Sequence, residues 1–334
     1  MEHQQQPENP QEERDEQSLA QPFAPPHHNK KITVLILALV IVAGIAVTVS
    51  QHFGGPLPTW DEIYEEMGFT EPQTTHEDDL AVHFIDVGQG DCIFVQTPTG
   101  DSLLIDAGEN GNEEKVISYL AQYGDDTLEY VVATHPHSDH IGALDGVLGA
   151  YTVQNILMPR LTESNTPTNS SYKNFLKAVK ASKAKVIAAK AGYTFSLGKG
   201  TCTVLAPTEQ TDDLNNLSVV LRLDWGETSF LFTGDAEKTE ERTILNGKYA
   251  DLLDADVLKM GHHGSRTSSS ASFLKAVSPR YCVISCGEDN DYGHPHKETL
   301  QKLEKLSIDP YRTDLSGSIR FYSDGITLSV ESDK

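Results

Sequence analysis

The distribution of apolar and polar residues divides the chain into four regions. Residues 1–31 are rich in Glu, Gln, Asn and Pro, and because this composition cannot bury a core they are predicted to be a disordered tail. Residues 32–50 form an uncharged apolar run, about as long as a membrane-spanning helix needs to be. Residues 51–78 are polar again and contain Gly and Pro, which predicts a linker. Short apolar runs continue through residues 79–334, which we expect to form one domain.

Within that domain, short apolar runs bounded by Gly, Asp and Pro predict strands, and longer stretches with helical periodicity predict helices. Strands are expected at 81–86, 91–96, 102–106, 130–133, 155–158, 186–188, 202–205, 218–223, 229–233, 257–260, 281–285, 318–322 and 326–330. Helices are expected at 113–123, 171–181, 236–245, 270–277 and 297–305. The last two strands resemble a hairpin that turns at 323–325. Because strands come in clusters with helices between them, the pattern predicts an α+β fold with two helix-covered sheets.

The charges on either side of the apolar run predict its orientation in a membrane. Lys30 and Lys31 precede it, whereas Asp61, Glu62 and Glu65 follow it. The positive-inside rule then leaves the tail in the cytoplasm and places the domain outside the cell membrane, on a single transmembrane helix. A cleaved signal peptide is the alternative. The anchor is favoured because the run is longer than a usual signal core and no small-x-small cleavage site follows it.

The composition narrows the partners and the cysteine chemistry. A formal net charge of −23 over 334 residues disfavours capture of nucleic acid by overall charge. The four cysteines show no C-x-x-C spacing, which argues against a zinc ribbon. Cys92 and Cys202 lie in apolar runs and are expected to be small buried side chains. Cys282 and Cys286 share a strand and its exit, so a disulfide between them stays open.

The segment from Thr134 to His140 holds three histidines and an aspartate directly after an apolar run. These side chains should therefore lie on a loop at the carboxyl end of a buried strand, where α/β layers place their chemistry. Imidazole and carboxylate groups are ligands that zinc, manganese and iron prefer. The spacing allows His135 and His137 to bind one ion while Asp139 and His140 face another.

Polar side chains follow four other predicted strands. Asp86 precedes two glycines and can orient ligand histidines from outside the metal shell, and Asp235 follows a glycine in a position suited to bridging two ions. Further histidines follow two later strands: His262, His263, His294 and His296. Each segment alone is explained as a turn, a surface pair or a solvated helix start. Their recurrence at strand ends favours a dinuclear metal site.

The run His135, His137, Asp139 and His140 resembles the H-x-H-x-D-H signature of the metallo-β-lactamase fold superfamily. More narrowly, the region from about 80 to 334 is similar to the metallo-β-lactamase-like domain of bacterial competence DNA-uptake proteins. The supporting segments are DVGQGD at 86–91, LLIDAG at 103–108, FTGDAE at 232–237, KMGHHGS at 259–265 and YGHP at 292–295. With one apolar span and no helix-rich channel module, the chain is not expected to form a DNA pore itself.

This resemblance implies an αββα sandwich that holds two divalent ions, zinc or manganese, with Asp235 bridging them. His135 and His137 would hold the first ion, and Asp139 and His140 the second. His294 best matches the final metal histidine, while His262 and His263 resemble histidines that contact phosphate or donate a proton; the reverse assignment stays open. Asn216 stands near where many members supply a third-motif histidine, and is a candidate catalytic residue.

The predicted function is metal-dependent hydrolysis outside the cytoplasmic membrane, with a phosphodiesterase or nuclease favoured. In this reading Asp139 orients a metal-activated hydroxide, and His263 stabilises charge in the transition state. A phosphorylcholine-type esterase acting on wall polymers is an alternative. A β-lactamase is disfavoured because the usual third-motif histidine is missing. A binding domain stabilised by metal is a third reading, disfavoured by the intact ligand set. No protein partner follows from the sequence.

Overall fold

This computed structural model of the chain describes residues 48–50, 55, 57, 76–124 and 126–334. The chain divides into two units, Met1–Thr74 and Thr75–Lys334. The predicted tail at 1–31 lies outside the described residues, as do most of the predicted transmembrane helix at 32–50 and most of the linker at 51–78. In the part of the chain that is described, no helix has the length and apolar character needed to cross a membrane.

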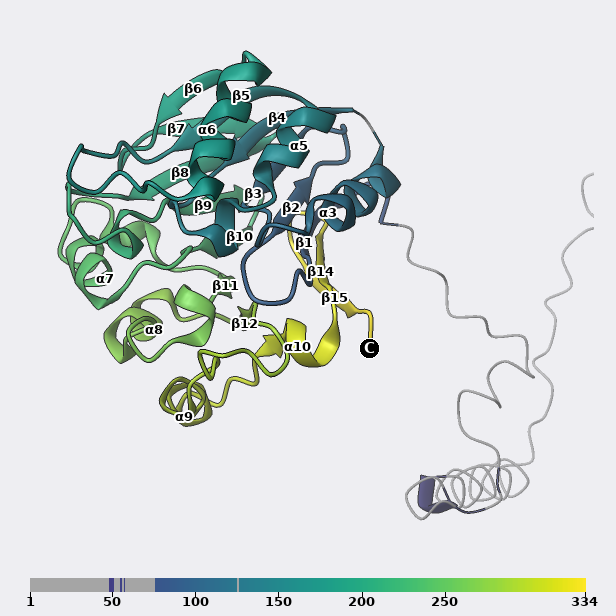
Figure 1. Cartoon of the computed structure of the whole chain (residues 1–334). Coiled ribbons are helices and arrows are strands. Elements are labelled where there is room, and N and C mark those ends of the chain that lie inside the picture. The colour runs from purple at the N-terminus through teal and green to yellow at the C-terminus, as the bar shows by residue number, and fades with distance from the viewer. Residues whose placement is uncertain (1–47, 51–54, 56, 58–75, 125) are drawn as a thin grey trace, which may run out of the picture. The chain divides into compact units, whose positions relative to one another are not determined.

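The second unit is built on two β-sheets (Figure 1). The first sheet has the order β15-β14-β1-β2-β3-β4-β5-β6 and the second has the order β13-β12-β11-β10-β9-β8-β7. The strands of the first sheet are β1 (Leu80–Phe84), β2 (Ile93–Gln96), β3 (Ser102–Ile105), β4 (Thr127–Val132), β5 (Thr152–Met158), β6 (Lys185–Ala188), β14 (Ile319–Ser323) and β15 (Leu328–Ser332). Those of the second are β7 (Thr194–Leu197), β8 (Gly200–Ala206), β9 (Val220–Trp225), β10 (Thr228–Phe232), β11 (Val257–Lys259), β12 (Tyr281–Ile284) and β13 (Tyr311–Arg312).

The main hydrophobic core joins residues from both sheets, because alternate side chains of each strand point to the same face. Phe84 of β1 and Phe232 of β10 meet there, with their ring centroids 6.2 Å apart. Two further cores lie between the sheets and their covering helices. The larger helices are α3 (Glu113–Leu120), α5 (Leu144–Ala150) and α6 (Ser170–Ser182) beside the first sheet, and α7 (Lys238–Leu245), α8 (Ala271–Val277) and α9 (Lys297–Lys305) beside the second. The prediction of two helix-covered sheets is confirmed.

Parallel pairing brings the candidate site together. Strands β3 to β6 are parallel to one another, and so are β10 to β13. Parallel neighbours end at the same edge of a sheet, so the polar residues that follow β10 and β11 lie together in the second sheet. The packing of the two sheets then brings them against the residues that follow β4 in the first sheet. This is why the strand-end residues converge.

Three kinds of local structure differ from the predictions. Two short strands, β7 and β13, were not expected, and helix α5 was missed because its sequence contains two glycines and reads as a turn. The hairpin is present, but β14 ends one residue later and β15 begins two residues later than predicted, and the Asp324 carboxylate between them accepts hydrogen bonds from the Ile326 and Thr327 amides. All four cysteines are buried and free, so Cys282 and Cys286 form no disulfide.

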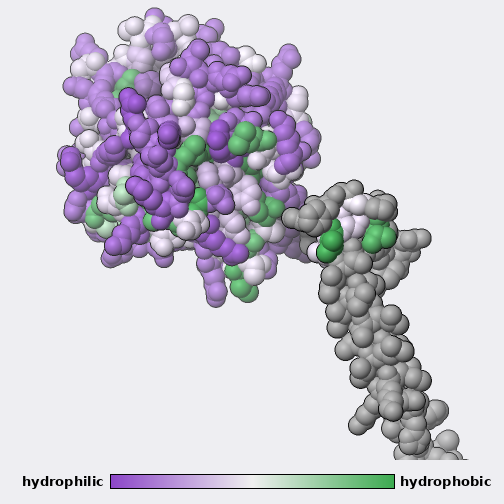
Figure 2. All heavy atoms as spheres, turned by 90° about the horizontal axis from the view of Figure 1, so that it is seen from below, coloured by the Kyte–Doolittle hydropathy of each residue, from purple (hydrophilic) through white to green (hydrophobic). Residues whose placement is uncertain are grey.

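The face of this unit seen in Figure 2 is mostly hydrophilic, with hydrophobic residues in small separate groups. The exposed large apolar side chains of the unit come from scattered positions, among them Val186, Tyr292, Leu315 and Ile326. Isolated apolar side chains are ordinary on a soluble surface. Charged and polar groups, rather than an apolar patch, therefore dominate this surface.

Candidate metal centre

The histidine cluster begins where β4 ends. Thr134 is buried, and its amide and hydroxyl both donate to the carboxylate of Asp106, at 2.8 and 2.6 Å. His135 and His137 follow in an extended segment, as predicted for a loop. Asp139 and His140 differ from the prediction because they lie on a single helical turn, α4 (Ser138–Ile141). That turn places them on a different side of the site from the two preceding histidines.

Two strand ends of the second sheet complete the cluster. Asp235 follows β10 and Gly234, and its amide donates to the Ser218 hydroxyl at 3.0 Å. His262 and His263 follow β11, and both adopt the left-handed backbone conformation, with φ of 52° and 53°. Such a conformation costs about 1–3 kcal/mol per non-glycine residue and is concentrated at functional sites. The strain aims two consecutive imidazoles at the same carboxylate.

Asp235 lies at the centre of the cluster, and its two oxygens face different histidines. Its Oδ1 is 3.2 Å from His140 Nε2 and 3.6 Å from His263 Nε2. Its Oδ2 is 3.8 Å from His135 Nε2 and 3.5 Å from His262 Nε2. A carboxylate in this arrangement presents one oxygen to each of two adjacent donor sets, as the bridging role predicted from sequence requires.

Two groups of metal-capable side chains, the donor groups, share Asp235, namely Asp139–His140–Asp235–His263 and His135–His137–Asp235, and a third consists of Asp91, Asp106 and His140; within each group one ligand atom per residue lies within 4.8 Å of the others. Nitrogen and oxygen donors bind zinc at about 2.0–2.2 Å, so ligands of one ion lie within roughly 4.4 Å of each other. Among the described residues, the buried atoms His140 Nε2, His263 Nε2 and Asp235 Oδ1 have no hydrogen-bond partner. Buried imidazole nitrogens and carboxylate oxygens without a hydrogen-bond partner are suited to binding divalent metal ions.

The carboxylates and imidazoles of the site are strongly coupled. Burial by itself lowers the pKa of His140, but the charges of Asp235, Asp106 and Asp139 outweigh it and hold that pKa well above the usual range. Burial likewise opposes the raised pKa of His263, which the carboxylates of Asp235 and Asp139 bring to about 10. For Asp235 the balance is reversed: the His140 and His263 charges overcome burial and lower its pKa. Carboxylates and protonated histidines therefore offset one another in the site, and binding of a cation should release protons from histidine.

A carboxylate orients His140, but it is Asp106 rather than Asp86. The His140 Nδ1 lies 2.7 Å from Asp106 Oδ2, and this contact leaves Nε2 directed at Asp235. The Asp86 carboxylate instead accepts a hydrogen bond from the Gly88 amide in its own turn. The prediction for Asp86 is wrong in this respect, because a short Asx-type turn satisfies the side chain locally. Asp106 was missed, although it also follows an apolar run in the LLIDAG segment.

A buried ion pair contacts His263 on the Nδ1 side of its ring. Lys259 is fully buried, and its Nζ lies 2.8 Å from Asp91 Oδ2 and 2.9 Å from the Met260 carbonyl. Asp91 Oδ1 is 3.3 Å from His263 Nδ1, which also lies 3.0 Å from the Ser285 carbonyl oxygen. With Nδ1 donating to these oxygens, Nε2 of His263 is left as the metal-binding atom. Asp91 was not predicted as a site residue, and Lys259, a possible phosphate contact from its sequence position, is instead paired with Asp91.

Asn216 does not lie in the donor groups but caps a helix. Its side-chain oxygen accepts from the amides of Glu237 and Glu240 at 3.2 Å each, and its side-chain nitrogen donates to Asp213. These amides belong to the first turn of α7, whose donors lack partners within the helix. The structure therefore gives Asn216 a structural role, and the catalytic role predicted for it is not supported by its contacts.

The donor groups open into a cleft of about 300 Å³, called the metal cleft below. His294 lines this cleft beside His262, with ring centroids 5.5 Å apart, but it belongs to neither donor group. Tyr292 stacks on His294 and is 61% exposed. The cleft is lined by Gln89, His137, Ser138, Asp139, Asn169, Asp235, His262, His263, Tyr292 and His294. Gln89 and Tyr292 lie in the segments DVGQGD and YGHP, so their position next to predicted ligands was a usable signal.

Comparison with known proteins is consistent with this geometry. The family model for the metallo-beta-lactamase superfamily matches residues 85–288. ComE operon protein 3 of Bacillus subtilis is 32% identical over 259 residues, covering 72% of this chain and 32% of that protein. Competence protein ComA of Neisseria gonorrhoeae is 30% identical over 292 residues, covering 86% of this chain and 38% of that protein. The chain thus spans about a third of the length of these relatives, and the resemblance to competence proteins is confirmed.

A solved structure supports the fold independently of sequence identity. A mutant of the CmlA beta-hydroxylase superposes with a TM-score of 0.50 at 13% identity, covering 83% of this chain and 58% of that one. At this level of identity the likeness concerns the fold alone. Function must be argued from the site.

Proposed function

The chain belongs to the metallo-β-lactamase superfamily, and on that basis we propose that it is a metal-dependent hydrolase of phosphodiesters, with nuclease activity favoured. One observation carries the proposal: beside an open cleft, Asp235 offers its two oxygens to two separate groups of metal-capable side chains, and one of these groups holds buried nitrogens without a hydrogen-bond partner. When bound there, two divalent ions, zinc or manganese, would stabilise charge on a phosphate and lower the pKa of a water molecule to near neutrality.

We assign the metal ligands from the donor groups. His135 and His137 would hold one ion, Asp139, His140 and His263 would hold the other, and Asp235 would be shared between the two groups. This assignment exchanges the roles that the resemblance implies for His263 and His294. The exchange follows from distance, since His263 Nε2 is 3.2 Å from Asp139 Oδ2 and 3.6 Å from Asp235 Oδ1.

The remaining residues of the cleft position the substrate and a proton. Asp139 borders the cleft, so one of its oxygens can orient a water molecule by accepting a hydrogen bond from it. Burial and the neighbouring histidines lower the pKa of His294 to about 4, which keeps its ring neutral near pH 7. A neutral His294 can donate a hydrogen bond to a phosphate oxygen without repelling the cations beside it. Its buried Nδ1 has no hydrogen-bond partner among the described residues.

The exchange of roles predicts opposite results for two alanine variants. His263→Ala should lower the metal content and weaken metal affinity by more than about 10- to 100-fold, the usual cost of altering a supporting group outside the ligand shell. His294→Ala should keep its metal and lose about 10²-fold in kcat, as for loss of a proton-transfer group. Metal analysis of the purified variants, together with their kinetics, measures both. If His294→Ala loses an ion and His263→Ala does not, His294 is the ligand.

Hydrolysis of bis(p-nitrophenyl) phosphate by the full-length chain with manganese or zinc tests the proposed activity. We expect turnover with at least one of these metals, and none for the Asp139→Ala variant, which should fold normally because Asp139 borders solvent. Silence of the metal-loaded wild-type protein with both metals would replace the proposal by the reading of a metal-stabilised binding domain.

We also propose that residues 32–50 anchor the chain in the cell membrane, with the hydrolase domain outside the cytoplasm and residues 51–78 as the linker. The support is the uncharged run itself and the lysines that precede it, Lys30 and Lys31. The partners are then the membrane and a phosphodiester such as nucleic acid. Protease treatment of intact cells should cleave the domain, and cleavage only after lysis would reverse the topology.

A further inference from the structure

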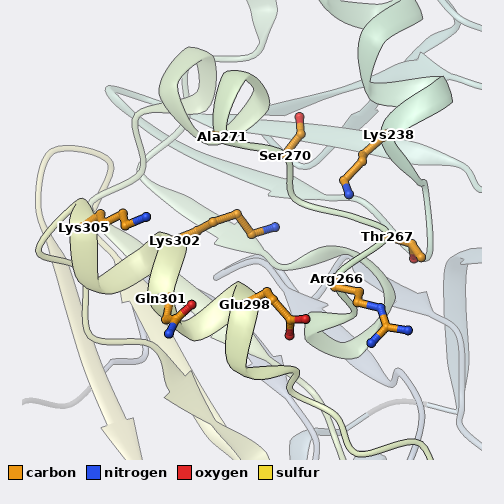
Figure 3. A pocket seen from close by; sticks show the side chains of 9 residues that line it. All are labelled: Lys238, Arg266, Thr267, Ser270, Ala271, Glu298, Gln301, Lys302 and Lys305. Carbon is orange, nitrogen blue, oxygen red and sulfur yellow. The ribbon is translucent and has the colours of Figure 1, made fainter.

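A second cleft, of about 550 Å³, lies outside the metal centre (Figure 3). It is bounded by the start of α7, the segment that precedes α8, and one side of α9. The side chains of Lys238 and Lys302 are directed into the space between these elements. The cleft is lined by Lys238, Arg266, Thr267, Ser270, Ala271, Glu298, Gln301, Lys302 and Lys305.

The charge of this cleft is opposite to that of the chain. Four cationic side chains and one carboxylate, that of Glu298, line it, whereas the whole chain carries a net charge of −23. Within the described part of the chain, Lys238, Arg266 and Lys305 make no ion pair within 4.0 Å. A gathering of unpaired cations in so acidic a protein favours an anionic ligand.

One cation of the cleft is fixed in place by the fold. Lys302 Nζ donates to the carbonyls of Ser268 and Ser269, at 2.9 and 2.6 Å. Beneath it, the Glu241 carboxylate accepts hydrogen bonds from the Ser269 and Ser270 amides. Lys302 therefore stabilises the segment that contains Ser268 and Ser269. The cationic groups available to a ligand are those of Lys238, Arg266 and Lys305.

The second cleft, called the basic cleft below, lies next to the metal cleft. The Thr267 hydroxyl, which lines the basic cleft, lies 3.3 Å from Nδ1 of His262, which lines the metal cleft. The Lys238 amide donates to the Thr267 carbonyl, and the Arg266 amide lies 3.1 Å from His296 Nδ1. Thr267 and His262, which line different clefts, are thus in contact.

We propose that the basic cleft is a second phosphate-binding subsite, which holds a phosphate of the same polymer strand whose neighbouring phosphodiester lies in the metal cleft. This inference rests on the proposed phosphodiesterase function and identifies the substrate class as a linear polymer of phosphodiesters. A small ester fills the metal cleft alone and gains nothing from Lys238 or Lys305. A polymer gains binding free energy at both clefts, and the second contribution depends on salt because it releases counterions.

The double variant Lys238→Gln/Lys305→Gln of the full-length chain tests the subsite. With an oligothymidylate of about twenty nucleotides at about 50 mM salt, kcat/KM should fall about tenfold. A plot of log kcat/KM against the logarithm of the salt concentration has a negative slope, which should become less steep by about 1. Turnover of bis(p-nitrophenyl) phosphate should be unchanged. Lys177→Gln/Lys185→Gln removes two exposed lysines that line neither cleft, and is the matched control.

A binding measurement separates this inference from the proposed activity. In the inactive Asp139→Ala background, fluorescence anisotropy of the labelled oligonucleotide should show about tenfold weaker binding for the double variant than for the control. Hydrolysis of the small ester by the wild-type protein reports on the proposed function by itself. If the small ester is cleaved but the two double variants bind the oligonucleotide equally well, the subsite is overturned while the function stands.

A glycerol phosphate polymer, run beside the oligonucleotide, identifies the source of the phosphate. A loss with both polymers assigns the subsite to the shared phosphate backbone, and a loss with one of them names that polymer; both results support the proposal. An equal loss with the small ester would place the lysines in the chemistry of the centre and overturn it. Weaker binding to phosphatidylglycerol vesicles with unchanged polymer hydrolysis would also overturn it, because the cleft would then contact lipid.

Discussion

Replacing Asp235 by asparagine is expected to reduce kcat/KM for bis(p-nitrophenyl) phosphate by about 10³-fold or more. The substitution keeps the shape of the side chain but removes the charge that faces both donor groups. A change outside the ligand shell costs roughly 10- to 100-fold in metal affinity or activity, so loss of a bridging ligand should cost more. Metal content should fall with activity, because neither donor group keeps an anionic oxygen from Asp235. Elemental analysis and steady-state kinetics measure the two effects.

Asp256→Asn is the matched control for this substitution. The Asp256 carboxylate is also hydrogen-bonded, to the amide and hydroxyl of Ser229, but it precedes β11 whereas the site follows that strand. Its variant should keep metal and activity. An Asp235→Asn protein with full metal content and activity within about tenfold of wild type would show that the carboxylate does not bridge two ions.

The second large effect concerns stability. Lys259→Met should destabilise the domain by about 3–5 kcal/mol, since removal of one partner of a buried ion pair leaves an uncompensated charge. Asp91 is that charge: burial alone would raise its pKa, but the Lys259 and His263 charges bring it to about 2, so it stays ionised at neutral pH. Urea unfolding followed by circular dichroism measures the loss.

The double variant Asp91→Asn/Lys259→Met separates the pair from simple packing. Replacing both charges by groups of similar volume is often neutral, so the double variant should recover most of the lost free energy of unfolding. It should not recover full activity, because Asp91 Oδ1 also faces His263 Nδ1. A Lys259→Met protein within about 1 kcal/mol of wild type would contradict a role for the pair in stability.

The proposed site links these two predictions. The buried pair holds the segment that follows β11, and the left-handed conformation of His262 and His263 then directs both rings toward Asp235. Strain of this kind persists only where the surrounding structure over-determines it. Asp91 and Lys259 thus connect the stability of the fold to the geometry of the centre.

Local sequence signals were sufficient for the residues that lie near one another along the chain. The spacing from His135 to His140 and the position of Asp235 after an apolar run predicted a cluster, and the structure brings these side chains together. The clustering of strands predicted two helix-covered sheets, which the strand order confirms. Both signals depend on periodicity and on the end of a buried strand, which are properties of short segments.

Sequence was insufficient where two groups with the same chemistry competed for one position. Asp86 and Asp106 both follow apolar runs, and only the pairing of β3 with β4 places Asp106 beside Thr134 and His140. The same holds for His263 and His294. Both line the cleft, but only His263 lies close to Asp139 and Asp235 as a member of a donor group. Asn216 was a catalytic candidate because it stands near the position of a third-motif histidine. Its capping contact could not be predicted, because the amides at the start of α7 lie twenty-one residues or more further along the chain.

The sequence by itself determined the donor types, their positions at strand ends, the two-sheet class and the resemblance to one superfamily, because these follow from local periodicity and motif spacing. Only the tertiary structure decided which carboxylate orients His140 and which histidine lies beside Asp139. It also decided that Lys259 forms an ion pair with Asp91, and that a basic cleft lies beside the metal cleft. The physical reason is that each of these contacts joins strands and helices distant in sequence, and parallel pairing and packing set their distances.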